Sequence, residues 1–344
     1  MQILKQVVGI DVAQKELVVS LGRLYENLTT EIYAYKTFVN SKDGFKALQA
    51  WEQKLAKPEM PVHYIMEATG VYHEPLAYHL AEQQCVVHIL MPNRISNYIR
   101  TLELKTITDK TSSQAIALFG LEKKLQPWSK PDPGLRELRQ LTRERGQLID
   151  ERTVLKNQLH AEKAEVNPNS KTIKRMQDRI KLLDQQQKEI LSEITEITKQ
   201  QASIKKAVTL MTSIPGIGLL TAATILAETN GFELIRNKKQ LTSYAGLDIR
   251  EKESGTSVKA KPRISKKGNK YLRKAMYLPA LTAVRHDERF KTIYDRLVAK
   301  HGIKMKALVA VQRKLLELSY SLCKVNTPYN KEHLLVQKAN QEVA

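Results

Sequence analysis

The first part of the chain, up to about residue 125, changes repeatedly between two patterns of apolar positions. Short runs rich in β-branched and aromatic residues, separated by turn-length gaps, predict strands at residues 7–13, 16–23 and 31–40. The pattern then changes to helical spacing behind Ser41, a candidate N-cap. Two further strands are predicted at residues 62–69 and 86–91, with helices between and after them. The predicted order is βββαβαβα, an α/β domain.

The middle of the chain, residues 135–204, consists almost entirely of helix-forming residues. From Ile173 its apolar positions alternate in steps of three and four, which is the spacing of a coiled coil. These positions are Met176, Ile180, Leu183, Ile190, Ile194, Ile197 and Ile204, with Gln187 and Gln201 at the two remaining places. A similar pattern runs from Leu138 to Leu159, and residues 167–170 (NPNS) separate the two, so we expect an antiparallel helical hairpin.

The apolar positions of the predicted hairpin form a seam, which allows two arrangements. The helices can pack only on each other, or the seam can also bind a second chain. Its length and its glutamines, which set register at some cost in stability, favour a partner chain. We therefore expect a homo-oligomer, at least a dimer.

The last part of the chain begins near Ala207 and contains a glycine turn that enters a helix. In SIPGIGLLTAATILAE, which starts at Ser213, Gly216 and Gly218 would let backbone amides approach a phosphate at the helix N-terminus, as in a helix-hairpin-helix. Such turns also serve as plain connectors between helices. The basic charge of the chain favours the DNA-binding interpretation.

A one-sided basic stretch follows between Arg250 and Lys274. It contains ten lysines and arginines against Glu251 and Glu253. A solvated surface usually mixes both signs, so this stretch is typical of a segment that contacts phosphates. The expected nucleic-acid-binding residues here are Lys259, Lys261, Arg263, Lys266, Lys267, Lys270 and Arg273.

Overall charge points to the same kind of partner. The 344 residues carry 56 Lys and Arg against 36 Asp and Glu, a net charge of +20, which favours a polyanion such as nucleic acid. Cys85 and Cys323 are too few for a disulfide framework and lack metal-ligand spacing, so we expect a reducing cytoplasm and no zinc. No signal peptide and no apolar run long enough for a membrane span is apparent.

Three acids stand where metal chemistry could use them. Asp11 and Glu67 each end the apolar run of a predicted strand, and Asp109 begins a predicted helix. Taken singly, Asp11 could cap a turn and Glu67 could pair with a lysine. Together the three predict a cluster of oxygen ligands suited to Mg²⁺ and to phosphodiester chemistry.

Ser254, Thr256 and Ser257 lie at the start of the basic stretch. A serine hydroxyl is a weak nucleophile that needs a base, a metal or concentrated positive charge, and no Ser-His-Asp spacing is visible nearby. From these residues alone, phosphate contact is the simpler expectation and nucleophilic attack the alternative.

Six motifs together resemble a known family. GIDVAQKELVVS, IMEATGVYHEPLAYHL, TDKTSSQAIA, SIPGIGLLTAATILAE, YAGLDIREKESGTSV and RISKKGNKYLRKAMYLPAL occur in the order seen in the DEDD transposases of bacterial insertion sequences. That family includes pilin-gene invertases and bridge-RNA-guided recombinases. The resemblance implies a RuvC-like domain of RNase H fold at residues 1–125, a coiled-coil linker at 126–205, and a mainly α transposase domain at 206–344.

The resemblance also implies roles for individual residues. Asp11, Glu67 and Asp109 become the first three metal-binding acids, and Ser254 the nucleophile, with Thr256 and Ser257 as supporting hydroxyls. The family's fourth acid follows the third by three residues, where this chain has Ser112. A hydroxyl ligates Mg²⁺ far more weakly than a carboxylate, so the departure puts the second metal and full activity in doubt.

The implied function is site-specific recombination of DNA in a bacterial cytoplasm. A guide RNA would choose donor and target DNA by base pairing, and a dimer or tetramer would hold the cut strands together. Two alternatives remain open. A nuclease would use the acids with water as nucleophile, and a catalytically silent nucleic-acid binder is compatible with Ser112.

Overall fold

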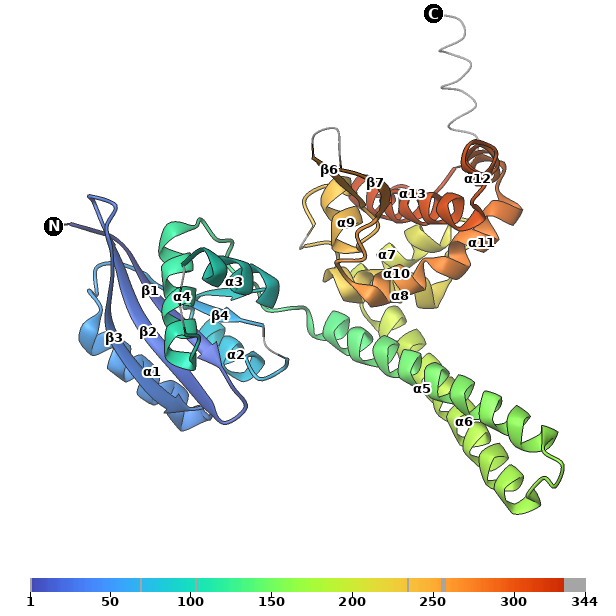
Figure 1. The fold of residues 1–344 in the computed structure, drawn as a ribbon, viewed down its shortest axis with the longest axis horizontal. Coiled ribbons are helices and arrows are strands. Elements are labelled where there is room, and N and C mark those ends of the chain that lie inside the picture. The colour runs from blue at the N-terminus through green and yellow to red at the C-terminus, as the bar shows by residue number, and fades with distance from the viewer. Residues whose placement is uncertain are drawn as a thin grey trace, which may run out of the picture. The chain divides into compact units, whose positions relative to one another are not determined.

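The computed structural model describes residues 2–330, except for residues 69, 103, 105, 234 and 255–257 and for the side chains of residues 251–262. The chain forms two compact units, Met1–Lys130 and Pro131–Ala344 (Figure 1). No helix within the described residues is both long and apolar enough to cross a lipid bilayer.

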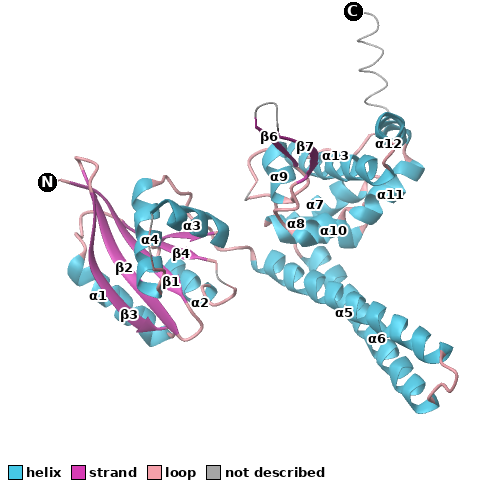
Figure 2. Ribbon diagram, in the orientation of Figure 1, coloured by secondary structure: helices cyan, strands magenta, loops and turns pink. Residues whose placement is uncertain are grey.

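A five-stranded sheet forms the centre of the first unit (Figure 2). The strands are β1 (Ile3–Val12), β2 (Glu16–Tyr25), β3 (Thr30–Val39), β4 (Val62–Glu67) and β5 (Val86–Leu90). Their order in space is β3-β2-β1-β4-β5, with the first three antiparallel and β1, β4 and β5 parallel. The helices are α1 (Lys42–Leu55), α2 (Glu74–Glu82), α3 (Pro92–Ile99), the 3₁₀ turn η1 (Arg100–Leu102) and α4 (Asp109–Glu122). The α/β prediction is confirmed, and Ser41 caps α1 by accepting from the Gly44 amide.

Both faces of the sheet are covered, as the alternating side chains of β1 and β4 require. One core joins β1 and β2 to α1 and α2 through side chains such as Ile10 and Leu48. A second core on the other face joins Val7 and Ile65 to α3 and α4.

Helix α4 lies unusually close to β1. A Cβ atom at Gly9 would stand 2.4 Å from the Ala117 backbone nitrogen and 2.5 Å from the Ser113 carbonyl oxygen, so only glycine fits there. The buried hydroxyls of Ser20 and Ser113 also pair at 2.7 Å. Since Ser113 lies beside Gly9 and Gly120 beside Val7, the helix runs antiparallel to β1. Its N-terminus therefore meets the end of β1 that carries Asp11.

The second unit is mainly helical, which confirms the prediction for the C-terminal part of the chain. It begins with two long helices, α5 (Pro133–Ala164) and α6 (Ser170–Gln200), which pack as a hairpin (Figure 1). Asn169, inside the predicted break, caps α6 by accepting from two backbone amides. The remaining elements are α7 (Ala202–Thr212), α8 (Leu219–Thr229), α9 (Lys238–Tyr244), β6 (Ile249–Ser254), β7 (Val258–Ile264), α10 (Lys270–Ala275), α11 (Tyr277–His286), α12 (Glu288–His301) and α13 (Lys304–Val325).

The predicted continuous seam to Ile204 is wrong. Helix α6 ends at Gln200, and Gln201 has an extended backbone. The Gln201 side chain packs against Gly134 at the start of α5, where a Cβ atom would be 2.2 Å from its amide nitrogen. Ile204 lies on α7 and is buried in the core of the helical unit.

The seam residues nearest this core are also covered by the chain itself. Ile190, Ile194 and Ile197 share one core with Leu135 and Leu138 of α5. Ile180, nearer the far end of the hairpin, is only half-buried. Any contact with a partner chain is therefore expected at the far end of the hairpin.

Candidate functional site

The parallel pairing of β1 and β4 places two acids at one edge of the sheet. Ile10 pairs with Met66, so Asp11 and Glu67 are the next residues on adjacent strands. Asp109 is the first residue of α4, whose N-terminus is fixed by a reciprocal capping box between Thr108 and Thr111. Strand register and helix packing thus bring all three predicted acids to one region.

The three acids also interact electrostatically. The pKa of Asp11 is raised from 3.8 to about 6, mainly by burial and then by the negative charges of Asp109 and Glu67. The Val12 backbone amide and the Ser112 hydroxyl oppose this shift by hydrogen bonding to the carboxylate. Asp11 therefore carries a charge that nearby acids disfavour, which is the electrostatic condition in which a cation binds well.

Ser112 reaches the acids from one turn into α4. It is half-buried and bonds to Asp11, whereas Ser113 beside it points into the sheet and pairs with Ser20. Position 112, where the resemblance implied a fourth acid, therefore faces Asp11.

The donor set fits a hard divalent cation in chemistry, since carboxylates and a hydroxyl are oxygen ligands. In the described part of the chain, however, no three His, Cys, Asp or Glu side chains lie close enough to hold a metal ion. The acids are gathered at one edge without forming a closed coordination shell.

Ser254 lies in the second unit, at the last position of β6, where it pairs with Val258. Gly255, Thr256 and Ser257 lie outside the described residues, as do the side chains of Ser254, Lys259 and Lys261. The predicted nucleophile is thus placed at the tip of a two-stranded hairpin.

The remaining predicted basic residues differ in their surroundings. Arg263, Lys266, Lys267 and Lys270 are exposed. Arg273 is half-buried and donates to the Ala245 carbonyl oxygen at 2.8 Å, so part of its role is structural.

The two glycines of the turn between α7 and α8 also differ. Gly216 has φ of +94°, and a Cβ atom there would lie 2.5 Å from the Pro279 carbonyl oxygen on α11. The close contact that requires glycine at position 216 is therefore with α11 of the same chain. Gly218, the N-cap residue of α8, is exposed with open space around it, so its backbone is the part of the turn that a phosphate could approach.

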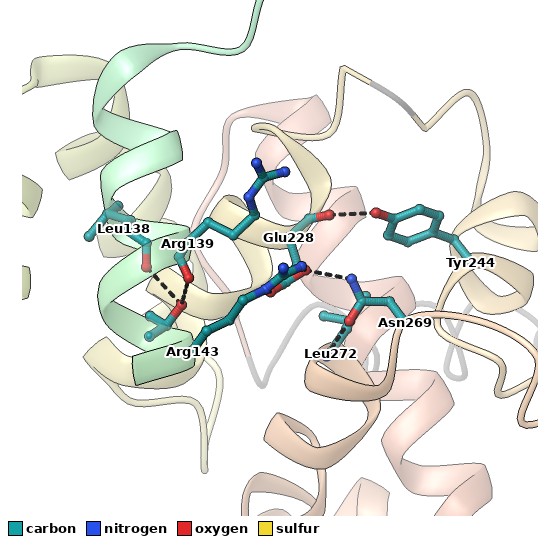
Figure 3. Close-up of polar contacts among 8 residues, drawn as sticks. Leu138, Arg139, Arg143, Glu228, Tyr244, Asn269 and Leu272 are labelled. Carbon is teal, nitrogen blue, oxygen red and sulfur yellow. Dashed lines mark hydrogen bonds and ion pairs between the residues drawn. The ribbon is translucent and has the colours of Figure 1, made fainter. Parts of the chain in front are cut away.

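One buried group escaped the sequence-based predictions. Glu228 on α8 forms a two-point ion pair with Arg143 of α5 and also bonds to Asn269 and Tyr244 (Figure 3). The available signal was an acid inside the otherwise apolar helix LLTAATILAET, which requires a partner when buried.

Comparison with known proteins adds the relatives of this chain. Residues 208–295 match the model of the transposase IS116/IS110/IS902 family, and residues 8–168 match a second transposase model, of the DEDD type. A pilin gene-inverting protein of Moraxella bovis is 30% identical over 300 residues, which cover 86% of this chain and 90% of that protein. The pilin gene-inverting protein of Moraxella lacunata is 29% identical over 332 residues, covering 95% and 98%. Among solved structures, T. thermophilus RuvC in complex with a Holliday junction substrate is similar over 36% of this chain and 99% of its own, with 11% identity and a TM-score of 0.28.

Proposed function

This chain belongs to the IS116/IS110/IS902 family of DNA transposases, and from that premise we propose that it is a site-specific recombinase that cuts DNA with Ser254 and rejoins it. The observation that carries the proposal is the convergence of Asp11, Glu67 and Asp109 at one sheet edge, with Ser112 bonded to Asp11. The name of the Moraxella bovis relative, a pilin gene-inverting protein, supports rejoining as well as cutting, because inversion of a DNA segment requires both.

The proposed reaction is a phosphoryl transfer to the protein and back. The Ser254 hydroxyl oxygen forms a bond to the scissile phosphorus, its proton passes to a base, and the bond from phosphorus to one DNA oxygen breaks. That DNA oxygen takes up a proton, and a hydroxyl of another strand later reverses the step and restores the serine. Asp11, Glu67 and Asp109 would hold Mg²⁺, which when bound would stabilise negative charge on the phosphate oxygens.

The partners follow from charge and family. A net charge of +20 and exposed Arg263, Lys266, Lys267 and Lys270 suit the phosphates of donor and target DNA. Family resemblance supports a guide RNA that selects both by base pairing. We also propose a dimer or tetramer, because strand exchange needs several cut ends held together.

Ser112 favours a second candidate function, a nucleic-acid binder with little or no cutting activity. Its hydroxyl bonds to Asp11 but adds no negative charge to the acid cluster. A hydrolytic nuclease, in which water replaces serine as nucleophile, is the other outcome that the experiment must separate.

A suicide DNA substrate, in which one cut strand cannot rejoin, distinguishes the three functions. A trapped protein–DNA adduct supports the recombinase, free nicks support the nuclease, and neither product supports the binder. The assay compares the unsubstituted chain with Ser112→Asp. Ser254→Ala should abolish the adduct while DNA affinity stays within about twofold, because one hydroxyl is lost without change of charge. If Ser257→Ala abolishes the adduct and Ser254→Ala does not, the assignment of the nucleophile is wrong.

A further inference from the structure

The Glu228 carboxylate is almost completely enclosed by the helical unit. Its side chain is 1% exposed, and Nε and Nη2 of Arg143 donate to its two oxygens at 2.7 and 2.8 Å. Such a two-point pair holds both side chains in one orientation. The Arg143 guanidinium also lies 4.4 Å from the centre of the Tyr271 ring, which restricts it further.

Asn269 connects this ion pair to two neighbouring elements. Its side-chain amide donates to Glu228 Oε2 at 2.6 Å, and its side-chain oxygen caps α10 by accepting from the Leu272 amide at 2.9 Å. Its backbone amide donates to the Tyr244 carbonyl oxygen at 2.7 Å. The Tyr244 hydroxyl in turn donates to the Glu228 carbonyl oxygen at 2.8 Å, which closes a ring of contacts (Figure 3).

Residues 265–269, which end in Asn269, also hold the base of the β6–β7 hairpin. The Ser265 amide donates to the Asp248 carbonyl oxygen at 2.9 Å, and the two side chains bond at 2.6 Å. A Cβ atom at Gly268 would lie 2.5 Å from the Tyr244 carbonyl oxygen, so residues 265–269 lie directly against the end of α9. Strand β6 begins one residue after Asp248, and β7 ends one residue before Ser265.

The β6–β7 hairpin extends from this base. Its register runs from Ile249 opposite Ile264 at the base to Ser254 opposite Val258 at the tip. Five residues of strand span about 17 Å. A small rotation of the hairpin about its base therefore moves the tip farther than it moves the base. Chemistry at a phosphate loses rate when the attacking atom is misplaced by about 1 Å.

We infer that Glu228, acting through Asn269, is a positioning residue that anchors the β6–β7 hairpin and so determines where Ser254 is presented. The role of Ser254 as nucleophile rests on the proposed function, whereas the anchoring of the hairpin does not. A network that served only to stabilise the helical core would leave the order of the hairpin unchanged when the link to Asn269 is cut.

Asn269→Ser cuts that link selectively. Serine is as good a helix cap as asparagine, so α10 keeps its N-cap, but its side chain is too short to reach Glu228. Asn169→Ser, the same change at the cap of α6, is the matched control. Asn269→Asp is a second variant, which keeps the cap and places a carboxylate against Glu228.

Hydrogen exchange of the full-length protein gives the first measurement. We expect the backbone amides of strands β6 and β7 to exchange at least about tenfold faster in Asn269→Ser than in the control, with exchange in α5 and α8 changed by less than about twofold. A uniform increase in exchange across the helical unit would overturn the inference. So would the absence of any increase at the hairpin in both Asn269→Ser and Asn269→Asp.

Adduct formation on the suicide substrate, in the Ser112→Asp background, gives the second measurement. We expect Asn269→Ser to slow it at least about tenfold at saturating DNA, with DNA affinity changed less than about twofold. Adduct formation as fast as in Asn169→Ser would also refute positioning. If the parent forms no Ser254-dependent adduct, the proposed function fails, and hydrogen exchange still decides whether Glu228 anchors the hairpin.

Discussion

At the scale of single residues, position 112 tests whether the acid cluster is a metal site. The Ser112 hydroxyl already bonds to Asp11, so an aspartate at the same position would point its carboxylate at the same group. Because a fourth carboxylate lowers the cost of holding two divalent cations together, we expect Ser112→Asp to raise Mg²⁺-dependent strand cleavage at least about a hundredfold. Cleavage by the two proteins is measured side by side on one DNA substrate. Equal rates would show that position 112 is not at a metal site.

Asp11 provides a second test at this scale, in the absence of metal. Its folded pKa of about 6 lies above the unfolded value of 3.8, so the folded protein binds the proton more tightly, and stability falls as the pH rises from about 4 to about 6. A shift of this size is worth about 3 kcal/mol for a fully buried group, and about 1 kcal/mol after solvent screening of a half-buried one. Asp11→Asn should therefore stabilise the protein by about 1 kcal/mol at pH 8 in EDTA and by almost nothing at pH 4. Thermal unfolding measures both, and a loss of stability at pH 8 would contradict the electrostatic account.

At the scale of elements, the hairpin of α5 and α6 has two parts with different surroundings. Ile194 is fully buried in the chain's own core, whereas Ile180 is half-buried. A buried charge costs more than about 3 kcal/mol, so Ile194→Asp should unfold the helical unit, and Ile180→Asp should cost less than about 1 kcal/mol. If the hairpin pairs with a second chain, Ile180→Asp should also reduce the mass in solution to that of a monomer. Thermal unfolding and light scattering check the two effects, and an unchanged oligomer in Ile180→Asp would exclude pairing through this part of the seam.

At the scale of the whole molecule, the net charge of +20 predicts that nucleic acid binds mainly through its phosphates. The exposed side chains of Lys266 and Lys267 lie in the segment 265–269 at the hairpin base, so their substitution by glutamine removes two charges while the backbone contacts of that segment can remain. We expect Lys266→Gln with Lys267→Gln to weaken binding to all sequences alike and to flatten the salt dependence by about one unit of slope for each phosphate that a lysine no longer neutralises. Binding titrations at several salt concentrations on two unrelated duplexes test this. Weaker binding confined to one duplex would mean that these lysines read bases.

Local patterns in the sequence were sufficient for the elements of the first unit and for singling out the candidate acids, but not for the β6–β7 hairpin of the second unit. The order βββαβαβα, the Ser41 cap and the break before α6 were predictable because each depends on residues close together in the chain. Asp11, Glu67 and Asp109 could be singled out for the same reason, since each stands at the end of a recognisable strand or helix.

Contacts between distant residues decided the rest. Gln201, which follows the end of α6, packs against Gly134, and Gly216 packs against α11. A periodic pattern records neither contact. Ser112 comes within hydrogen-bonding distance of Asp11 only because α4 packs on Gly9. Glu228 shows the limit most clearly: the sequence marks it as an acid in an apolar helix, but its partners Arg143 and Asn269 come from other parts of the chain, and only folding brings them together.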